Sequence, residues 1–333
     1  MKQNVFVTGA DGMLGMSICR ELISQGYHVK AFVLSVPKSF LTSSPDVEIV
    51  TGNVLDPESV ERELAGCDFL IHCAALTSVW PRRSAAVLHT NLNGTRNVLE
   101  AAKKAGVKRM VHIGTASSFT PGSIDRPGDE ASAYSGWKFC LDYTDSKYLA
   151  QQLLLKEYSE NGFPVVILNP TYMLGPYDSG PSSGKMLIEI LESKIFGYSP
   201  GGKNFVCSAD VARAVVNSLR TGRTGECYII GGENLSYREF FEIVCKATDK
   251  KIKLFKIPAS LILVFGFISS AFARLTFTHP RLSFTMARFA CVDQYYSSRK
   301  AEEELGYLPA SIEKGINSCV DWFKSNGYLN GPF

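Results

Sequence analysis

The first 170 residues alternate between two patterns of apolar positions. Apolar runs typical of strands buried on both faces occupy residues 4–9, 28–34, 47–54, 68–76, 108–117 and 164–170. Apolar residues recur at helical spacing over residues 13–25, 56–66 and 85–106, and again after residue 142. This alternation predicts a parallel sheet with helices on both faces, the doubly wound α/β architecture.

The pattern becomes less regular after about Pro170. Short helix and strand signals continue to the end of the chain, without a repeat period. We therefore predict a sheet domain over residues 1–170. Residues 171–333 are predicted to form mainly a smaller substrate-binding lobe, with elements that return to the sheet around residues 203–232. Ligands of such folds bind at the carboxyl ends of the strands.

Charge and cysteine content narrow the class of protein. The 333 residues carry 35 basic and 32 acidic side chains, a net charge of +3, without a long basic run. We therefore expect no nucleic-acid partner. The cysteine number is odd, nine, and no C-x-x-C pair occurs, so we expect free thiols, a reducing compartment and no metal site. An apolar strand begins within four residues of Met1 and leaves no room for a signal peptide. These features predict a soluble cytoplasmic protein.

Three glycines follow the first predicted strand, in the sequence "TGADGMLG". Gly9 permits a tight turn, and Gly12 lets the backbone approach a pyrophosphate that sits on the N-terminus of the next helix. Gly15 completes the spacing. Because a strand precedes the motif and a helix follows it, the segment predicts a dinucleotide-binding Rossmann fold.

A tyrosine and a lysine one helical turn apart can act as one acid/base unit, and "YSGWKFCLDYTDSK" contains this spacing twice. One pair is Tyr134 with Lys138, and the other is Tyr143 with Lys147. The spacing alone favours neither pair.

Several segments resemble, in order, the extended branch of the short-chain dehydrogenase/reductase superfamily, which is the NAD-dependent epimerase/dehydratase family. Its dihydroflavonol reductases and 3β-hydroxysteroid dehydrogenases are the most similar members. The segments are "TGADGMLG", "DFLIHCAAL", "NLNGTRNVLEAAKKAGVKRMVHIGTAS", "YTDSKYLAQ", "LNPTYMLGPYD", "GGKNFVCSADVARAVV" and "YYSSRKAEEELGY". The resemblance covers almost the whole chain.

The resemblance implies that Tyr143 and Lys147 are the active pair. In the family these residues begin a long helix, with serine before the lysine, as Ser146 stands here. Tyr143 would exchange a proton with the substrate oxygen, while Lys147 would hold the ribose and favour the phenolate. The family's Ser/Thr position falls on Thr115, or on Ser117 or Ser118 if the register slips. Asn91 matches a family asparagine near the nicotinamide.

The resemblance also implies a nicotinamide cofactor. Its expected contacts are Gly9, Gly12, Met13, Leu14, Gly15, Ser35, Lys38, Asn53, Val54, Ala74, Tyr143, Lys147 and Pro170. An NAD-preferring site usually has a carboxylate after the second strand, but "FVLSVPKSF" offers only Ser35 and Lys38 there. We therefore favour NADP(H) over NAD(H).

Three functions are compatible with these residues. The favoured one is an oxidoreductase acting on a ketone or secondary alcohol of a hydrophobic small molecule. The alternative is a nucleotide-sugar epimerase, although Asn169 replaces the arginine that many of those enzymes carry. The third, a non-catalytic cofactor sensor, is disfavoured by the retained tyrosine and lysine.

A long apolar segment, "IPASLILVFGFISSAFARLTF" (residues 257–277), lies in the predicted smaller lobe. Its apolar tract from Leu261 to Ala273 is shorter than the roughly 20 residues that cross a bilayer. One interpretation is packing against the sheet domain or a homodimer partner. A second is that one face lines the substrate cleft opposite Tyr172 and Met173. A third is shallow contact with a membrane surface.

Overall fold

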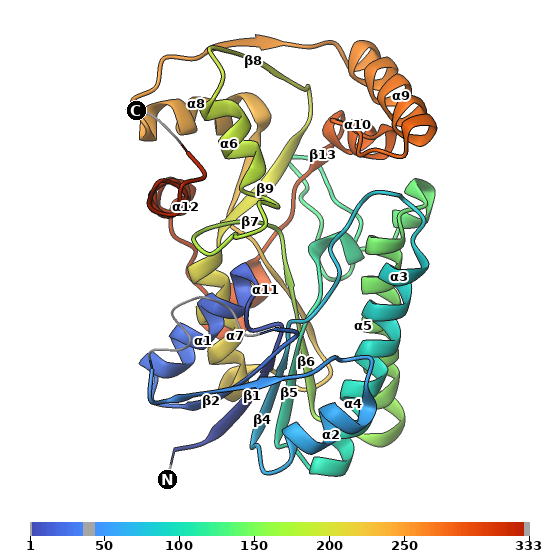
Figure 1. Cartoon of the computed structure of the whole chain (residues 1–333), viewed down its shortest axis with the longest axis vertical. Helices are drawn as coiled ribbons and strands as arrows, with labels where there is room; N and C mark the ends of the chain where they lie inside the picture. The colour runs from blue at the N-terminus through green and yellow to red at the C-terminus, as the bar shows by residue number, and fades with distance from the viewer. Residues whose placement is uncertain (1, 36–43, 330–333) are drawn as a thin grey trace.

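A seven-stranded parallel sheet forms the lower half of the molecule in Figure 1, a computed structural model that describes residues 2–35 and 44–329. Its strand order is β10-β6-β5-β4-β1-β2-β3. The strands are β1 (Asn4–Thr8), β2 (His28–Val33), β3 (Val47–Thr51), β4 (Phe69–His72), β5 (Arg109–Ile113), β6 (Val165–Pro170) and β10 (Cys227–Ile230). The predicted doubly wound Rossmann architecture is confirmed.

Helices cover both faces of this sheet (Figure 1). One layer contains α1 (Met13–Ser24), α7 (Ser208–Thr221) and α11 (Arg299–Leu305), and the other contains α2 (Pro57–Leu64), α4 (Gly94–Ala105) and α5 (Asp142–Asn161). Strand alternation sends Val5 and Val7 into the first core and Phe6 into the second. Elements after residue 170 thus return to the sheet, and α11 does so beyond the range expected from the sequence.

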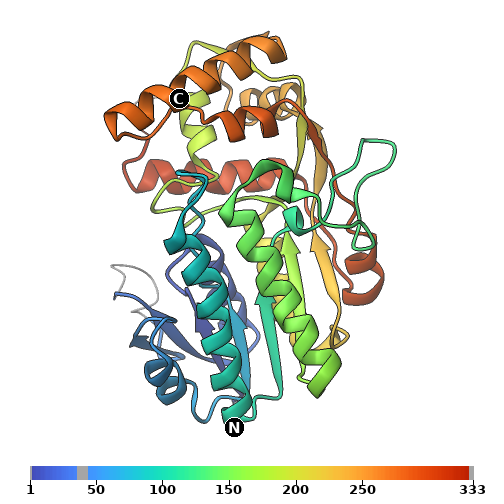
Figure 2. The ribbon, with the colours of Figure 1, turned by 90° about the vertical axis from the view of Figure 1, so that its right-hand side faces the viewer.

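The smaller lobe lies above the carboxyl ends of the strands (Figures 1 and 2). Its strands are β7 (Tyr172–Leu174), β8 (Ile195–Tyr198), β9 (Gly202–Cys207), β11 (Glu233–Ser236), β12 (Lys253–Lys256) and β13 (Asp293–Gln294). Its helices are α6 (Lys185–Leu191), α8 (Tyr237–Ala247), α9 (Ala259–Thr276), α10 (Phe284–Ala290) and α12 (Ile312–Ser325). A separate apolar core around Phe205, Phe240 and Phe323 holds this lobe together.

Residues 85–106 form three consecutive helical segments rather than the single helix expected. A short α3 (Ala85–Leu88) leads into a π-helical turn, η2 (His89–Asn93), and then into α4. Single π-turns inside helices are often found at functional sites. Here the turn contains Asn91.

The apolar segment forms α9, and the expectation that it is too short to cross a bilayer is wrong. The helix has 18 residues rather than 13, because Ala259, Ser260 and residues 274–276 extend it, and by length and composition it could cross a membrane. It is also largely exposed, since only 22% of it is buried. Among the described residues, none from α9 lines the two cavities that Tyr143 borders.

Candidate active site

The glycine loop joins β1 to α1 and fits closely around its own backbone. Gly9 has a φ of +65°, and a Cβ there would lie 2.7 Å from the Ala74 Cα. A Cβ on Gly15 would lie 2.1 Å from the Gly9 carbonyl oxygen. Gly12 caps α1 without a side chain and so leaves the helix N–H groups open to an anion. The loop thus has the shape that a bound pyrophosphate requires.

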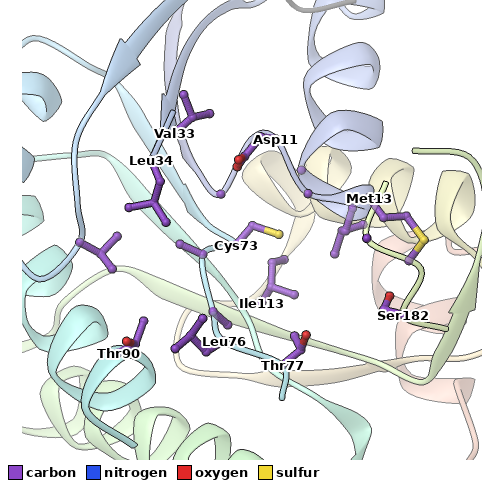
Figure 3. A pocket seen from close by; sticks show the side chains of 18 of the residues that line it. Asp11, Met13, Val33, Leu34, Cys73, Leu76, Thr77, Thr90, Ile113 and Ser182 are labelled. Carbon is purple, nitrogen blue, oxygen red and sulfur yellow. The ribbon is translucent and has the colours of Figure 1, made fainter. Parts of the chain in front are cut away.

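A cleft of about 510 Å³ opens beside this loop (Figure 3). Its lining includes these expected cofactor contacts: Gly9, Gly12, Met13, Leu14, Gly15, Asn53, Val54, Ala74, Tyr143 and Lys147. Ser35 is exposed and is not part of the lining, whereas its neighbour Leu34 is. Pro170 lines the adjacent cavity instead, and Lys38 lies outside the described residues.

Val33 and Leu34 give the end of the cleft beside β2 apolar walls, but the Asp11 side chain of the glycine loop lies next to Val33 there (Figure 3). Val33 and Leu34 project there, far from Met13 and Ser182 in Figure 3. Leu34 is 71% exposed and lines the cleft, so a charged side chain introduced at this position would contact both the solvent and a ligand in the cleft. The Asn53 side chain accepts a hydrogen bond from the Leu55 N–H (2.9 Å), which fixes its orientation in the cleft.

Tyr143 and Lys147 lie one turn apart near the start of α5. The Lys147 ammonium donates a hydrogen bond to the Ile113 carbonyl at the end of β5, and burial lowers its pKa to about 8. Burial raises the Tyr143 pKa, and a hydrogen bond with Thr115 opposes that shift. The sequence-based expectation of a phenolate concerned the site with Lys147 and the positive ring of a bound oxidised nicotinamide together, and it stays a prediction.

Thr115 follows β5 and is nearly buried. Its N–H donates to the Asn169 side-chain oxygen (2.9 Å), which fixes the loop next to β6. Ser117 lines the same cavity as Thr115, but Ser118 borders neither cavity that contains Tyr143. Thr115 is thus placed where the family position was expected. Asn169, noted in the sequence only for the arginine it replaces, proves to position that loop.

Asn91 connects three segments of the site without lining either cavity. Its amide nitrogen donates to the Leu76 carbonyl (3.0 Å) and to the Ser146 hydroxyl (2.9 Å), and its oxygen accepts from the Leu76 N–H (2.8 Å). Ser146 in turn donates to the Tyr143 carbonyl (2.9 Å). These hydrogen bonds would suit a positioning role, and the catalytic role expected for Asn91 from the sequence stays a prediction.

The second tyrosine–lysine pair lies away from the cleft. Tyr134 donates to the Asp145 carboxylate (2.6 Å) and stacks on Tyr148 with ring centroids 4.2 Å apart. The Lys138 ammonium lies over the Phe139 ring in a 3₁₀ turn. Neither residue lines a cavity that contains the glycine loop, so the structure brings only the Tyr143–Lys147 pair to that loop.

A second cavity, of about 400 Å³, meets the first at Tyr143. Both expected substrate contacts, Tyr172 and Met173, line it, and α10 contributes Met286 and Phe289. Sequence reasoning missed Lys203, whose ammonium lies 4.5 Å from the centre of the Tyr172 ring. No acidic side chain is found among the described residues that line this cavity, and burial lowers the Lys203 pKa to about 8. No local sequence motif marks Lys203, because it lies on β9 while its neighbour Tyr172 lies on β7, and these strands are far apart in the sequence.

The doubly wound sheet, the open helix N-terminus and the adjacent tyrosine and lysine together define a nicotinamide-dependent enzyme of the extended short-chain dehydrogenase/reductase class. Residues 5–231 match the model of the NAD dependent epimerase/dehydratase family, and the chain belongs to that family.

Curated relatives agree with this assignment, and a solved structure shares the fold. A Synechocystis protein with a provisional dihydroflavonol 4-reductase name is 29% identical over 97% of this chain and 95% of its own. A farnesyl-dihydroquinoline-oxide ketoreductase of Stigmatella aurantiaca is 30% identical over 76% of this chain and 75% of its own. The dTDP-glucose 4,6-dehydratase of Streptomyces venezuelae, solved with NAD bound, superimposes with a TM-score of 0.78 over 98% of this chain and 99% of its own, at 22% identity. The family resemblance seen in the sequence is thus confirmed.

Proposed function

We propose that this protein is an NAD(P)-dependent reductase of ketones on hydrophobic small molecules, running in reverse as an alcohol dehydrogenase. The observation that carries the proposal is that Tyr143 borders both the glycine-loop cleft and the second cavity. A proton donor at this junction can reach a substrate while the cofactor occupies the neighbouring space.

Each residue of the site has a role in this scheme. The bound cofactor would supply or accept the hydride. Tyr143, kept neutral by burial, would donate its phenolic proton to the developing alkoxide of the substrate. Thr115, hydrogen-bonded to Tyr143, would hold the same oxygen, and the Lys147 ammonium would stabilise the phenolate that remains.

The second cavity supports an apolar substrate. Its walls include Val79, Leu141, Met173, Met286 and Phe289, with a few polar groups that could orient a ligand. The Stigmatella relative is named as the reductase of a farnesylated ketone, and transferring that substrate class to this chain belongs to the proposal.

One observation favours the epimerase alternative. Lys203 stands in the cavity without a neighbouring carboxylate among the lining residues described, and an ammonium in such a place can bind a phosphate. A panel assay separates the two functions. We expect reduction of steroid, flavonoid or acyl-chain ketones and no turnover of UDP- or dTDP-sugars. Epimerised nucleotide sugars with untouched apolar ketones would overturn the proposal.

The two tyrosines provide a matched test of the mechanism. Tyr143→Phe should lower kcat by about 10²- to 10⁴-fold, because the transferable proton is lost, while cofactor affinity stays nearly unchanged. Tyr134→Phe removes a hydrogen bond to Asp145, and neither residue lines the two cavities that contain Tyr143, so this variant should retain turnover. Loss of activity in Tyr134→Phe with retention in Tyr143→Phe would show that the wrong pair has been assigned.

We further propose that NADP(H) is preferred over NAD(H), because Val33, Leu34 and Ser35 offer no carboxylate to repel a 2′-phosphate. Fluorescence titration should give a lower Kd for NADPH than for NADH. Leu34→Asp should reverse the order, since it places a carboxylate at the exposed end of β2, whereas the uncharged Leu34→Asn should not. Lys38→Ala should weaken the preference. Equal affinities in the parent protein would contradict the assignment.

A further inference from the structure

The outer side of α9 exposes large apolar side chains to solvent. We call this surface the α9 face: Leu261, Val264, Phe265, Phe267, Ile268, Phe272, Leu275 and Phe277, each at least 50% exposed. Its four phenylalanines are 50%, 63%, 64% and 96% exposed. At roughly 200 Å² per ring they alone present on the order of 500 Å². The largest apolar patch of an ordinary monomer is about 300–600 Å², so the whole face exceeds that range.

The opposite side of α9 attaches it firmly to the lobe. Ile262, Gly266, Ser270 and Ala273 form one buried stripe. A Cβ on Gly266 would lie 2.6 Å from the Ala287 Cβ of α10, so the two helices are in close contact. The Ser270 hydroxyl accepts a hydrogen bond from the Phe284 N–H (2.8 Å). Held along this stripe, α9 lies lengthwise on the outer edge of the lobe, as Figures 1 and 2 show.

The sequence of α9 and its flanks is rich in basic residues, and its nearest acidic residues are Asp249 and Asp293. Residues 250–292 contain no aspartate or glutamate, but they include the seven cations Lys250, Lys251, Lys253, Lys256, Arg274, Arg281 and Arg288. The whole chain has a net charge of +3, so the remaining residues carry a net −4. Lys253 and Lys256 are exposed before the helix, and Arg274 and Arg281 are exposed at its end or beyond. In the sequence, exposed cations therefore stand before and after the residues of the apolar face.

We propose that the α9 face docks onto the surface of a bilayer that contains anionic phospholipid. An apolar helix side with flanking cations is the arrangement of helices that lie in the interfacial plane, where anionic headgroups attract lysine and arginine. A second copy of the chain fits less well. A two-fold interface would bring the same cations together from both copies, and only Asp249 and Asp293, at the two borders of residues 250–292, could supply a nearby carboxylate in the sequence.

Helix α10 lies between α9 and the second cavity. Phe284 and Ala287 of α10 contact α9, while Met286 and Phe289 of the same helix line the cavity that contains Tyr143. The α9 face lies on the opposite side of α9, so the docking does not depend on the proposed function.

Flotation of the full-length protein with lipid vesicles tests the proposal. We compare phosphatidylcholine vesicles with vesicles that contain about a third phosphatidylglycerol. The parent should float with the anionic vesicles and be released by high salt. Phe267→Ser/Phe272→Ser and Lys253→Glu/Lys256→Glu should each lower the bound fraction at least about tenfold.

Matched controls keep the result interpretable. Leu308→Ser, at an apolar side chain 78% exposed outside the α9 face, and Lys156→Glu, on α5, should bind vesicles like the parent. NADPH titration checks that every variant is folded, independently of turnover.

Three outcomes would overturn the proposal. The first is a parent that ignores anionic vesicles. The second is a dimer in sedimentation velocity that the Phe267→Ser/Phe272→Ser variant abolishes while vesicle binding is absent. The third is membrane binding that resists both high salt and alkaline carbonate, which would indicate a spanning helix.

Discussion

Gly15 and Gly12 differ sharply in what a methyl group would meet, although both belong to the same loop. At Gly15 the new Cβ would lie 2.1 Å from the Gly9 carbonyl oxygen and 2.8 Å from the Ala10 Cα. Both are backbone atoms, so α1 must move away from the loop. At Gly12 the nearest atom is the Gly9 oxygen at 3.5 Å, an ordinary contact.

These distances set the expected loss of stability. Overpacking costs about 1–3 kcal/mol, and the upper value applies to Gly15→Ala because no side chain can yield. Replacing glycine by alanine inside a helix recovers about 1 kcal/mol. We therefore expect Gly15→Ala to lower the free energy of unfolding by about 2 kcal/mol. Gly12→Ala, at an N-cap, should cost about 1 kcal/mol or less.

Cofactor affinity should respond differently from stability. In Gly12→Ala the methyl group stands where a pyrophosphate approaches the helix N-terminus, so the Kd for NADPH should rise at least about tenfold in a stable protein. Urea unfolding followed by circular dichroism, with fluorescence titration of NADPH, measures both effects. A Gly15→Ala variant as stable as the parent, or a Gly12→Ala variant that binds normally, would refute the reasoning.

Two further predictions concern the reaction. Since burial lowers the Lys147 pKa to about 8, its charge is present below that pH and lost above it. The reduction rate should therefore fall as pH rises through about 8, and Lys147→Arg should move that fall to higher pH. A profile that stays flat to strongly alkaline pH would contradict this. Asn91→Ala should lower kcat about tenfold with little change in KM, because Ser146 and the Tyr143 carbonyl lose their support. Asn93→Ala, which removes a partly exposed hydrogen bond to His89, is its control, and equal kcat in both variants would count against a positioning role for Asn91.

The parallel sheet and the glycine loop could be predicted from the sequence because their signals are local. Most of the sheet strands are predominantly apolar runs, and the glycines of "TGADGMLG" lie between a strand and a helix that can both be recognised in the sequence. The structure also brings Thr115 to Tyr143, as alignment with the family pattern indicated.

The features that escaped prediction depend on contacts between distant segments. The π-helical turn directs Asn91 toward Ser146, but no characteristic residue composition marks such a turn in the sequence. Lys203 enters the second cavity only because β9 pairs with β7. The exposure of α9 could not be foreseen from its composition, because an apolar helix is equally consistent with a core position.

The position of β10 at the edge of the sheet has a consequence for synthesis on the ribosome. Its partner β6 ends at Pro170, but β10 begins only at Cys227, 57 residues later. At about 5–20 residues per second, β6 waits roughly 3–11 s for its neighbour. During that time β6, whose six residues are all buried in the folded protein, has one unpaired edge of the kind that recruits other chains. The nascent protein is therefore most prone to aggregate while the smaller lobe is still being translated, and a fragment that stops at residue 170 would keep this exposed edge permanently.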